Sequence, residues 1–503
     1  MNRRYLASAF LVSCCLAAPA AAQTPPDPAA PAPAAEPAPA PPPAPPATEP
    51  TVAPAPAAAP GTGQPAAPAP PAESTKAGAA PSPGVVSSKW SMTIYGFAEF
   101  DLMHDTTQSF SDSPGNGLIV RPDANRLGYN NGRTQTTARN SRLGVRMAAP
   151  ETHGMKSTGL IEMDFMGNQP PGISEGSFVN NGTFRVRAAY AKVESDYVDM
   201  LAGQYYFLFG EQPFFFPMSI WYFGLPNQVF GRTQQFRLSH LFKTPAVNVD
   251  VAASAQRPPQ RDSEIPDFQG GLKLSLNSWT GPHTVGSGYA AVDPLTISVS
   301  GSVRHLRVVE FAAAPTRTHA ANGAGISVDA MIPVIPAKST KDKANAVTLT
   351  GSFVTGQGIG DLIGGLSGGA SFPALPTPAG ATTAPTFTPG IDGGIVQYDA
   401  DGKLRTLDWR TFMAGIQYYL PPNGEVTIGA NYTQGDSDNI TQGLTGSALT
   451  KVMKRSQYFE VVALGDLTPA IRVGAAFQRL WQKFGDDHKV VNDRIEFSVF
   501  FFF

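Results

Sequence analysis

Hydrophobic and polar residues alternate along most of this chain, in segments of about ten residues. The last segment, residues 494–503, shows the pattern clearly. Its apolar side chains all fall on one face of an extended strand: Ile495, Phe497, Val499, Phe501 and Phe503. An apolar face that runs to a final phenylalanine is typical of the closing strand of a bacterial outer-membrane β-barrel. A hydrophobic strand docked in a soluble core is the alternative.

The same alternation recurs from Trp90 onward, between clusters of Gly, Pro, Asn and Asp, and helical periodicity is not sustained anywhere. It predicts about sixteen strands. They are expected near residues 94–103, 140–147, 159–165, 184–190, 197–206, 233–243, 246–255, 270–278, 295–304, 324–334, 345–355, 409–420, 424–433, 456–464, 469–478 and 494–503. The predicted fold class is therefore all-β, a transmembrane antiparallel barrel wide enough to hold water.

Parity along each strand assigns side chains to the lipid or to the lumen. In the first strand, for example, Phe100 and Leu102 would face lipid while Glu99 and Asp101 face inward. The basic residues with inward parity are Arg142, Arg146, Arg185, Arg187, Arg237, Arg304 and Arg472. The acidic residues with inward parity are Glu99, Asp101, Glu162, Asp164, Asp250 and Glu460.

Two functions are open for these inward charges. A cluster of guanidinium groups in a narrow pore favours anionic solutes. Alternatively, the charges pair across neighbouring strands and only stiffen the wall. The residues expected to line the pore or its constriction are Arg142, Arg146, Arg185, Arg187, Arg237, Glu162, Asp164 and Glu211.

Two long loops interrupt the strand pattern. Residues 207–232 are too rich in proline and bulky aromatics for a solvated loop, so we expect them to fold into the lumen, with Glu211 opposite the basic wall. Their aromatic side chains would either pack against the barrel or form an apolar track for solutes. Residues 356–394 carry few charges and suit a mobile external cap.

The N-terminal part of the chain predicts export. Arg3 and Arg4 precede an apolar run and three alanines, which fits a signal peptide over residues 1–22. A lipoprotein cleavage box ending at Cys14 is the alternative. Both cysteines lie in this segment, so the mature chain has no thiol chemistry. Residues 23–88 are nearly all proline and alanine, which predicts an extended periplasmic linker, and residues 89–503 would form the barrel.

The remaining composition argues against other chemistry. Basic and acidic residues nearly balance, so nucleic acid is not an expected partner. The seven histidines are scattered, and no cofactor or metal site is predicted. Residues 365–369 match a nucleophile pattern around Ser367, but they lie in a glycine-rich loop that could not hold the serine against a base. No catalytic residue is expected, and the chain is not predicted to be an enzyme.

Four segments resemble one family. Ser141-Arg-Leu-Gly-Val-Arg146, Gly159-Leu-Ile-Glu-Met-Asp-Phe165, Arg187-Ala-Ala-Tyr-Ala191 and Leu201-Ala-Gly-Gln-Tyr205 are similar, in this order, to the front half of DcaP-like trimeric outer-membrane porins. The resemblance covers about residues 92–240. It implies a homotrimer of sixteen-stranded channels in the bacterial outer membrane, with an inward third loop and a preference for small anions such as dicarboxylates. The Pro/Ala segment replaces the coiled coil common in that family, and the loop after Gln204 is more aromatic.

Together these features predict a porin for passive diffusion of small hydrophilic, anionic solutes, surrounded by outer-membrane lipid. Two alternatives stay open. The barrel could anchor an envelope tether that reaches the cell wall through residues 23–88, or the aromatic loop could serve more hydrophobic solutes.

Overall fold

The structure is a computed structural model that describes residues 90–112, 117–168, 180–221, 224–258, 263–366, 372, 375, 377–391, 394–399 and 401–503. The expected signal peptide, the Pro/Ala segment and Ser367 lie outside these residues. Residues 81–503 form one compact unit, which contains the barrel. Among the described residues, no helix is both long and apolar enough to cross a membrane.

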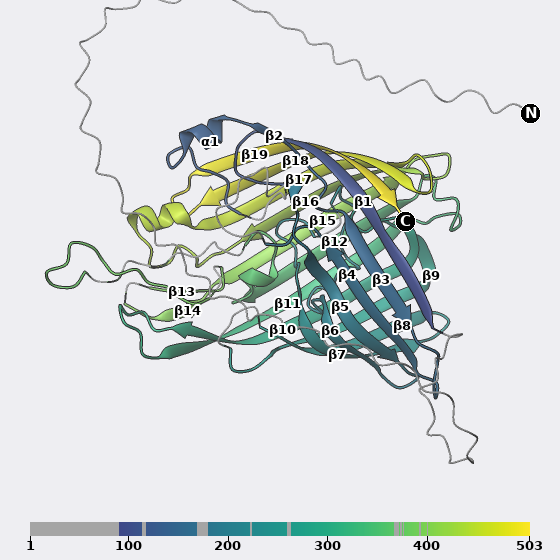
Figure 1. The fold of residues 1–503 in the computed structure, drawn as a ribbon, viewed down its shortest axis with the longest axis horizontal. Helices are drawn as coiled ribbons and strands as arrows, with labels where there is room; N and C mark the ends of the chain where they lie inside the picture. The colour runs from purple at the N-terminus through teal and green to yellow at the C-terminus, as the bar shows by residue number, and fades with distance from the viewer. Residues whose placement is uncertain are drawn as a thin grey trace, which may run out of the picture. The chain divides into compact units, whose positions relative to one another are not determined.

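Seventeen strands form one closed antiparallel sheet (Figure 1). They are β1 (Ser91–Asp105), β2 (Arg133–Thr137), β3 (Arg142–Ala148), β4 (Lys156–Asp164), β5 (Arg185–Glu194), β6 (Asp199–Tyr206), β7 (Arg232–Lys243), β8 (Val247–Gln256), β9 (Asp267–His283), β10 (Ala291–Val309), β11 (Thr318–Ile335), β12 (Val347–Gln357), β15 (Asp408–Tyr419), β16 (Val426–Asp436), β17 (Met453–Asp466), β18 (Ile471–Phe484) and β19 (Lys489–Phe502). The loops carry α1 (Arg126–Asn130), η1 (Gly360–Leu362), η2 (Gly446–Lys451) and a small sheet of β13 (Val396–Tyr398) and β14 (Leu404–Thr406).

The barrel wall has sixteen positions because β2 and β3 share one of them. β2 pairs with the second half of β1, where Asp101 lies opposite Thr137, and β3 pairs with the first half, where Phe97 lies opposite Arg142. The ring closes where β1 pairs with β19, with Phe97 opposite Phe502. The prediction of about sixteen strands is confirmed, and each predicted segment overlaps one wall strand.

The two faces of the wall differ as the alternation predicts. On β1, Phe100 is 48% exposed and Leu102 42%, whereas Glu99 is 4% exposed and Asp101 0%. Outward apolar side chains continue around the ring, including Phe236, Leu272, Ile297, Val328, Phe353, Ile416, Val461 and Phe497. A closed ring leaves no unpaired strand edge, so a barrel with this outer face can span a bilayer.

The barrel has two distinct mouths. The start of β1 and the end of β19 share one end, which we call the terminal mouth. Most connections at the terminal mouth are short turns, whereas long connections such as residues 207–231 and 358–407 lie at the opposite end, the loop mouth. Outer-membrane barrels place short turns in the periplasm and long loops outside the cell.

We expect Leu238→Arg to lower the free energy of unfolding by about 2–4 kcal/mol, because Leu238 faces lipid from the centre of β7. Ser239→Arg is the matched control, since the neighbouring side chain points into the lumen. Denaturant titration of the barrel in lipid vesicles measures both. Equal losses would contradict the assignment of the two faces.

Candidate functional site: the barrel lumen

The inward loop (residues 207–231) crosses the lumen between β6 and β7. Near its start, the Phe209 amide donates a hydrogen bond to Gln269 Oε1 on β9 at 2.8 Å. Farther along, Asn431 Nδ2 on β16 donates to the Met218 carbonyl at 2.6 Å, and Trp221 Nε1 donates to Glu496 Oε2 on β19 at 2.9 Å. The predicted inward course of this loop is therefore confirmed.

Most aromatic side chains of the inward loop are packing groups. Phe209 and Phe215 are 0% exposed, Phe216 1% and Trp221 3%. Phe207 and Phe209 join a larger apolar cluster with Ile363 and Trp409. The Phe230 amide of the inward loop donates to the carbonyl of Leu362, the last residue of η1, at 3.0 Å. These rings therefore pack against the protein and do not form an apolar track for solutes. The start of the predicted external cap, near residues 360–363, turns inward and contacts the inward loop.

Glycines on the inner wall leave space for this loop. A Cβ at Gly415 of β15 would lie 3.2 Å from the Pro217 side chain, and one at Gly429 of β16 would lie 3.3 Å from the Met218 sulfur. On β18, a Cβ at Gly474 would lie 3.5 Å from Ile220. The inward loop can therefore pack close to the wall, because the residue beneath it on each of these three strands is a glycine.

The lumen is filled on one side and open on the other. Inward side chains of β10–β19 and β1 are almost fully buried, including Ser300, Asp329, Thr350, Gln417, Asn431, Glu460, Glu496 and Asp101. Inward charged side chains of β5, β8 and β9 keep more solvent contact: Lys192 is 30% exposed, Asp250 29% and Lys273 23%. We call wall strands β3–β9 the open side. The wall strands from β10 to β19, without β13 and β14, form the blocked side together with β1.

Five of the predicted pore residues form one ion-pair network on the open side. Glu162 and Asp164 project from β4 between Arg142 on β3 and Arg185 and Arg187 on β5. Arg187 Nη1 lies 2.8 Å from Asp164 Oδ2, and Arg187 Nε lies 2.9 Å from Glu162 Oε1.

The outer members of the network differ in exposure. Arg185 also pairs with Asp164, at 2.6 Å, and keeps 34% of its side chain exposed. Arg142 lies 3.6 Å from Glu162 and is 4% exposed, while Arg187 is 0% exposed. Pairing across strands, which the sequence left open for each arginine, therefore holds for these three.

Arg146 and Arg237 lie beside this network with more freedom. Arg146 is exposed and its guanidinium lies 5.7 Å from the ring centroid of Tyr95. Arg237 is half-buried, donates to the Tyr206 carbonyl at 2.7 Å and lies over Tyr205. These two arginines therefore keep solvent contact on the open side.

Glu211 contacts a different part of the open side. Its carboxylate lies 3.9 Å from Lys273 Nζ on β9, and Lys273 lies 3.2 Å from Asp250 on β8. Burial raises the pKa of Glu211, and the nearby positive charges of Lys273 and Arg237 only partly oppose this. The ring of Phe214 lies 5.8 Å from Lys273 Nζ, so the inward loop and the wall meet here around a group of charges.

The sequence analysis missed Lys273 although its signal was present. Leu272 and Leu274 flank it and face lipid, so Lys273 has inward parity in the predicted strand 270–278. Within the described residues, no group of three or more His, Cys, Asp or Glu side chains could hold a metal ion.

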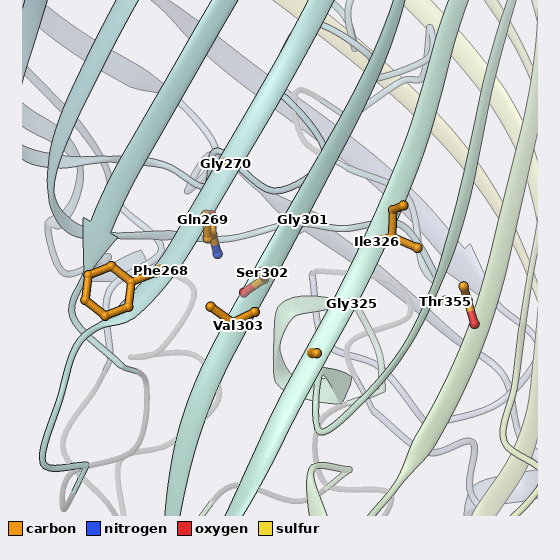
Figure 2. A pocket seen from close by; sticks show the side chains of 10 residues that line it. Phe268, Gln269, Gly270, Gly301, Ser302, Val303, Gly325, Ile326 and Thr355 are labelled. Carbon is orange, nitrogen blue, oxygen red and sulfur yellow. The ribbon is translucent and has the colours of Figure 1, made fainter.

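The recess of about 650 Å³ in Figure 2 is not part of the lumen. Phe268, Val303 and Ile326 surround it, and all three are outward-facing side chains of β9, β10 and β11. The recess is present because Gly270 and Gly301 add no side chain to this part of the outer face. A solute that crosses the barrel does not pass through this recess.

Comparisons with known proteins agree on the fold. No protein-family model matches the sequence, and no curated protein does either. The outer membrane channel DcaP of Acinetobacter baumannii has a similar structure, with a TM-score of 0.58 and 15% identity over 83% of this chain and 98% of that chain. The likeness to DcaP shows a shared barrel fold, in agreement with the resemblance found in the sequence.

Two other solved structures are similar at a lower level. An anion-selective porin from Comamonas acidovorans has a TM-score of 0.46 and 10% identity, over 82% of this chain and 100% of that chain. OmpT of Vibrio cholerae in its trimer form has a TM-score of 0.44 and 10% identity, over 83% of this chain and 100% of that chain.

We expect Asp164→Ala to cost roughly 3 kcal/mol of unfolding free energy, because it leaves the buried Arg187 with Glu162 as its one remaining carboxylate partner in the network. Asp438→Ala is the control, since its exposed pair with Arg410 is worth at most about 1 kcal/mol. Unfolding in denaturant measures both variants. A loss at Asp164 no larger than that at Asp438 would show that the network adds little stability.

Proposed function

We propose that this chain is an outer-membrane porin that lets small hydrophilic solutes diffuse passively, with a preference for anions such as dicarboxylates. The observation that carries this proposal is the asymmetric lumen. Solvent-accessible Arg146, Lys192, Arg237 and Lys273 follow the open side, while the opposite side is closed by protein. The two lysines also pair with accessible carboxylates there, those of Glu194, Asp199 and Asp250, so Arg146 and Arg237 contribute most to the excess of positive charge. A path lined by fixed positive charges lowers the energy of an anion that crosses it.

The outer face supports a lipid environment and a preferred orientation. The apolar exterior suits a bilayer, and the terminal mouth with its short turns would face the periplasm. A homotrimer is part of the proposal on the strength of the sequence resemblance. The dicarboxylate preference rests on the same resemblance.

Reconstitution in a planar bilayer tests the main claim. A salt gradient of potassium chloride across the membrane should give a reversal potential of the sign expected for chloride preference. Absence of stepwise currents from folded protein would reject the porin function, and a cation-selective current would reject the anion preference alone.

Lys273→Met should lower the chloride-to-potassium permeability ratio roughly sevenfold, because the lost charge shifts the energies of the two ions by about RT each, in opposite directions. A unit charge about 7 Å from an ion in water is worth roughly 0.6 kcal/mol, which is about RT, and Lys273 borders the constriction beside Glu211. Lys483→Met is the control, because that lysine faces outward on β18 and pairs with Asp487. An unchanged ratio in the folded Lys273 variant would place the passage elsewhere.

As the pH falls, the anion preference should begin to rise while an ordinary glutamate, whose pKa is about 4.3, is still charged. The raised pKa of Glu211 means that this carboxylate gains its proton earlier as the pH falls, which leaves Lys273 and Arg237 less compensated. Glu211→Gln should show the higher ratio already at neutral pH and lose this part of the dependence. Glu425→Gln, in an exposed turn at the terminal mouth, should behave like the native protein.

The tether alternative concerns residues 23–88, which lie outside the described residues. Deletion of that segment separates the two roles. Weakened envelope integrity with unchanged permeability would support a tether in addition to the pore.

A further inference from the structure

One hairpin at the terminal mouth does not end at the barrel rim. β9 and β10 continue as a pair beyond the wall, and their register shifts between Pro294 and Leu295. Leu295 lies opposite Leu276, but Pro294 lies opposite Thr280, so β9 has three extra residues at this point, namely 277–279. Such a bulge bends a hairpin sharply. We call residues 277–293 the mouth hairpin.

The mouth hairpin bends into the lumen along the blocked side. The backbone of Thr284 forms two hydrogen bonds with the side chain of Gln417 on β15. The Thr284 amide donates to Gln417 Oε1 at 2.9 Å, and Gln417 Nε2 donates to the Thr284 carbonyl at 3.0 Å. Thr348 on β12 donates to the Pro282 carbonyl. Gln417 and Thr348 are inward-facing wall residues with 0% exposure, so the hairpin lies inside the wall.

The mouth hairpin meets the inward loop in the middle of the barrel. The Gly286 amide donates to the Pro217 carbonyl at 3.0 Å, and the Ser219 amide donates to the Gly286 carbonyl at 3.2 Å. The rings of Phe214 and His283 lie 5.2 Å apart. Two segments that enter from opposite mouths are thus joined through their backbones.

Arg472 on β18 anchors the tip of the mouth hairpin. Its guanidinium donates to the Ser287 carbonyl at 2.7 Å and to the Gly288 carbonyl, and it pairs with Asp466 at 2.6 Å. It also lies 4.7 Å from the ring centroid of Tyr289. The strands that carry the hairpin, β9 and β10, are far around the ring from β18. The anchor therefore holds the hairpin across the mouth.

We propose that the inward loop and the mouth hairpin form one septum that confines solutes to the open side of the barrel. Arg472 is the positioning residue of the septum. It does not line the passage, but by holding the hairpin tip it sets how much of the lumen is open to ions. This inference rests on the proposed porin function, because a septum matters only if solutes cross. The fixed charges of the open side then act on every solute, since no path avoids them.

Removing the anchor tests the septum through conductance. Arg472→Met keeps much of the side-chain length but loses the guanidinium hydrogen bonds to Ser287 and Gly288, which leaves the bond from the Tyr289 hydroxyl to the Pro469 carbonyl at the hairpin tip. We expect single-channel conductance to rise on the order of twofold, as part of the blocked side opens. The chloride preference should fall at the same time, because the new path lacks the open-side charges. Arg479→Met is the matched control, since that arginine faces outward on the same strand and pairs with Asp493.

Cysteine labelling tests the septum without any current. The expected mature chain contains no cysteine, so a single introduced thiol reports one position. Ser239→Cys, on the open side of β7, should react with a charged, membrane-impermeant maleimide in folded protein. Thr350→Cys, 3% exposed on the blocked side of β12, should stay unreactive and become reactive when combined with Arg472→Met.

The outcomes separate the septum from the pore. Labelling as expected but without currents would reject the porin function and keep the septum. Thr350→Cys that reacts in the native background would reject the septum while currents persist. If Arg472→Met folds with native heat stability but changes neither conductance nor labelling at Thr350→Cys, Arg472 does not position the hairpin and that part of the inference fails.

Discussion

Closure of the hydrogen-bonded ring between β1 and β19 is the constraint on which the rest of this structure depends. In a bilayer, each unpaired backbone amide or carbonyl costs several kcal/mol, so an open sheet edge is not tolerated. Closure sets Phe97 opposite Phe502, and it thereby fixes the total of the register shifts between neighbouring strands around the ring. Register in turn decides the face of every side chain, because a shift by one residue would move the apolar set into the lumen.

The interior shows what such a wall permits. A ring of sixteen strands encloses more volume than its own side chains can fill. This chain fills part of that volume with two backbone segments, and small wall residues such as Gly415 and Gly429 admit them. The inward loop would collide with ordinary side chains at these positions. The blocked side is therefore built by the wall and the loops together.

Charge follows the same division. On the blocked side, Glu460 and Glu496 are buried and hold the inward loop through Ser219 and Trp221, so they act as hydrogen-bond acceptors for the protein itself. On the open side, the carboxylates of β4 hydrogen-bond Arg187 and form a looser ion pair with Arg142, at 3.6 Å. On the same side, Arg146 is exposed, and Lys192 and Lys273 keep 30% and 23% of their side chains exposed. Position in the barrel, more than residue type, separates the buried charges that hold the protein together from those that keep solvent contact.

The sequence by itself determined the fold class, the number of wall strands, the inward course of residues 207–231 and the face of each strand residue, because alternation with a period of two is a local property. It could not determine which inward charges stay accessible. That depends on contacts between distant residues, such as Arg187 with Glu162 or Lys273 with Glu211. The mouth hairpin was equally hidden, since nearly all of residues 277–293 falls in the connection between the predicted strands 270–278 and 295–304. Only the tertiary structure brings Gly286 to Pro217 and Arg472 to Ser287, because a lumen joins segments whose separation along the chain carries no local signal.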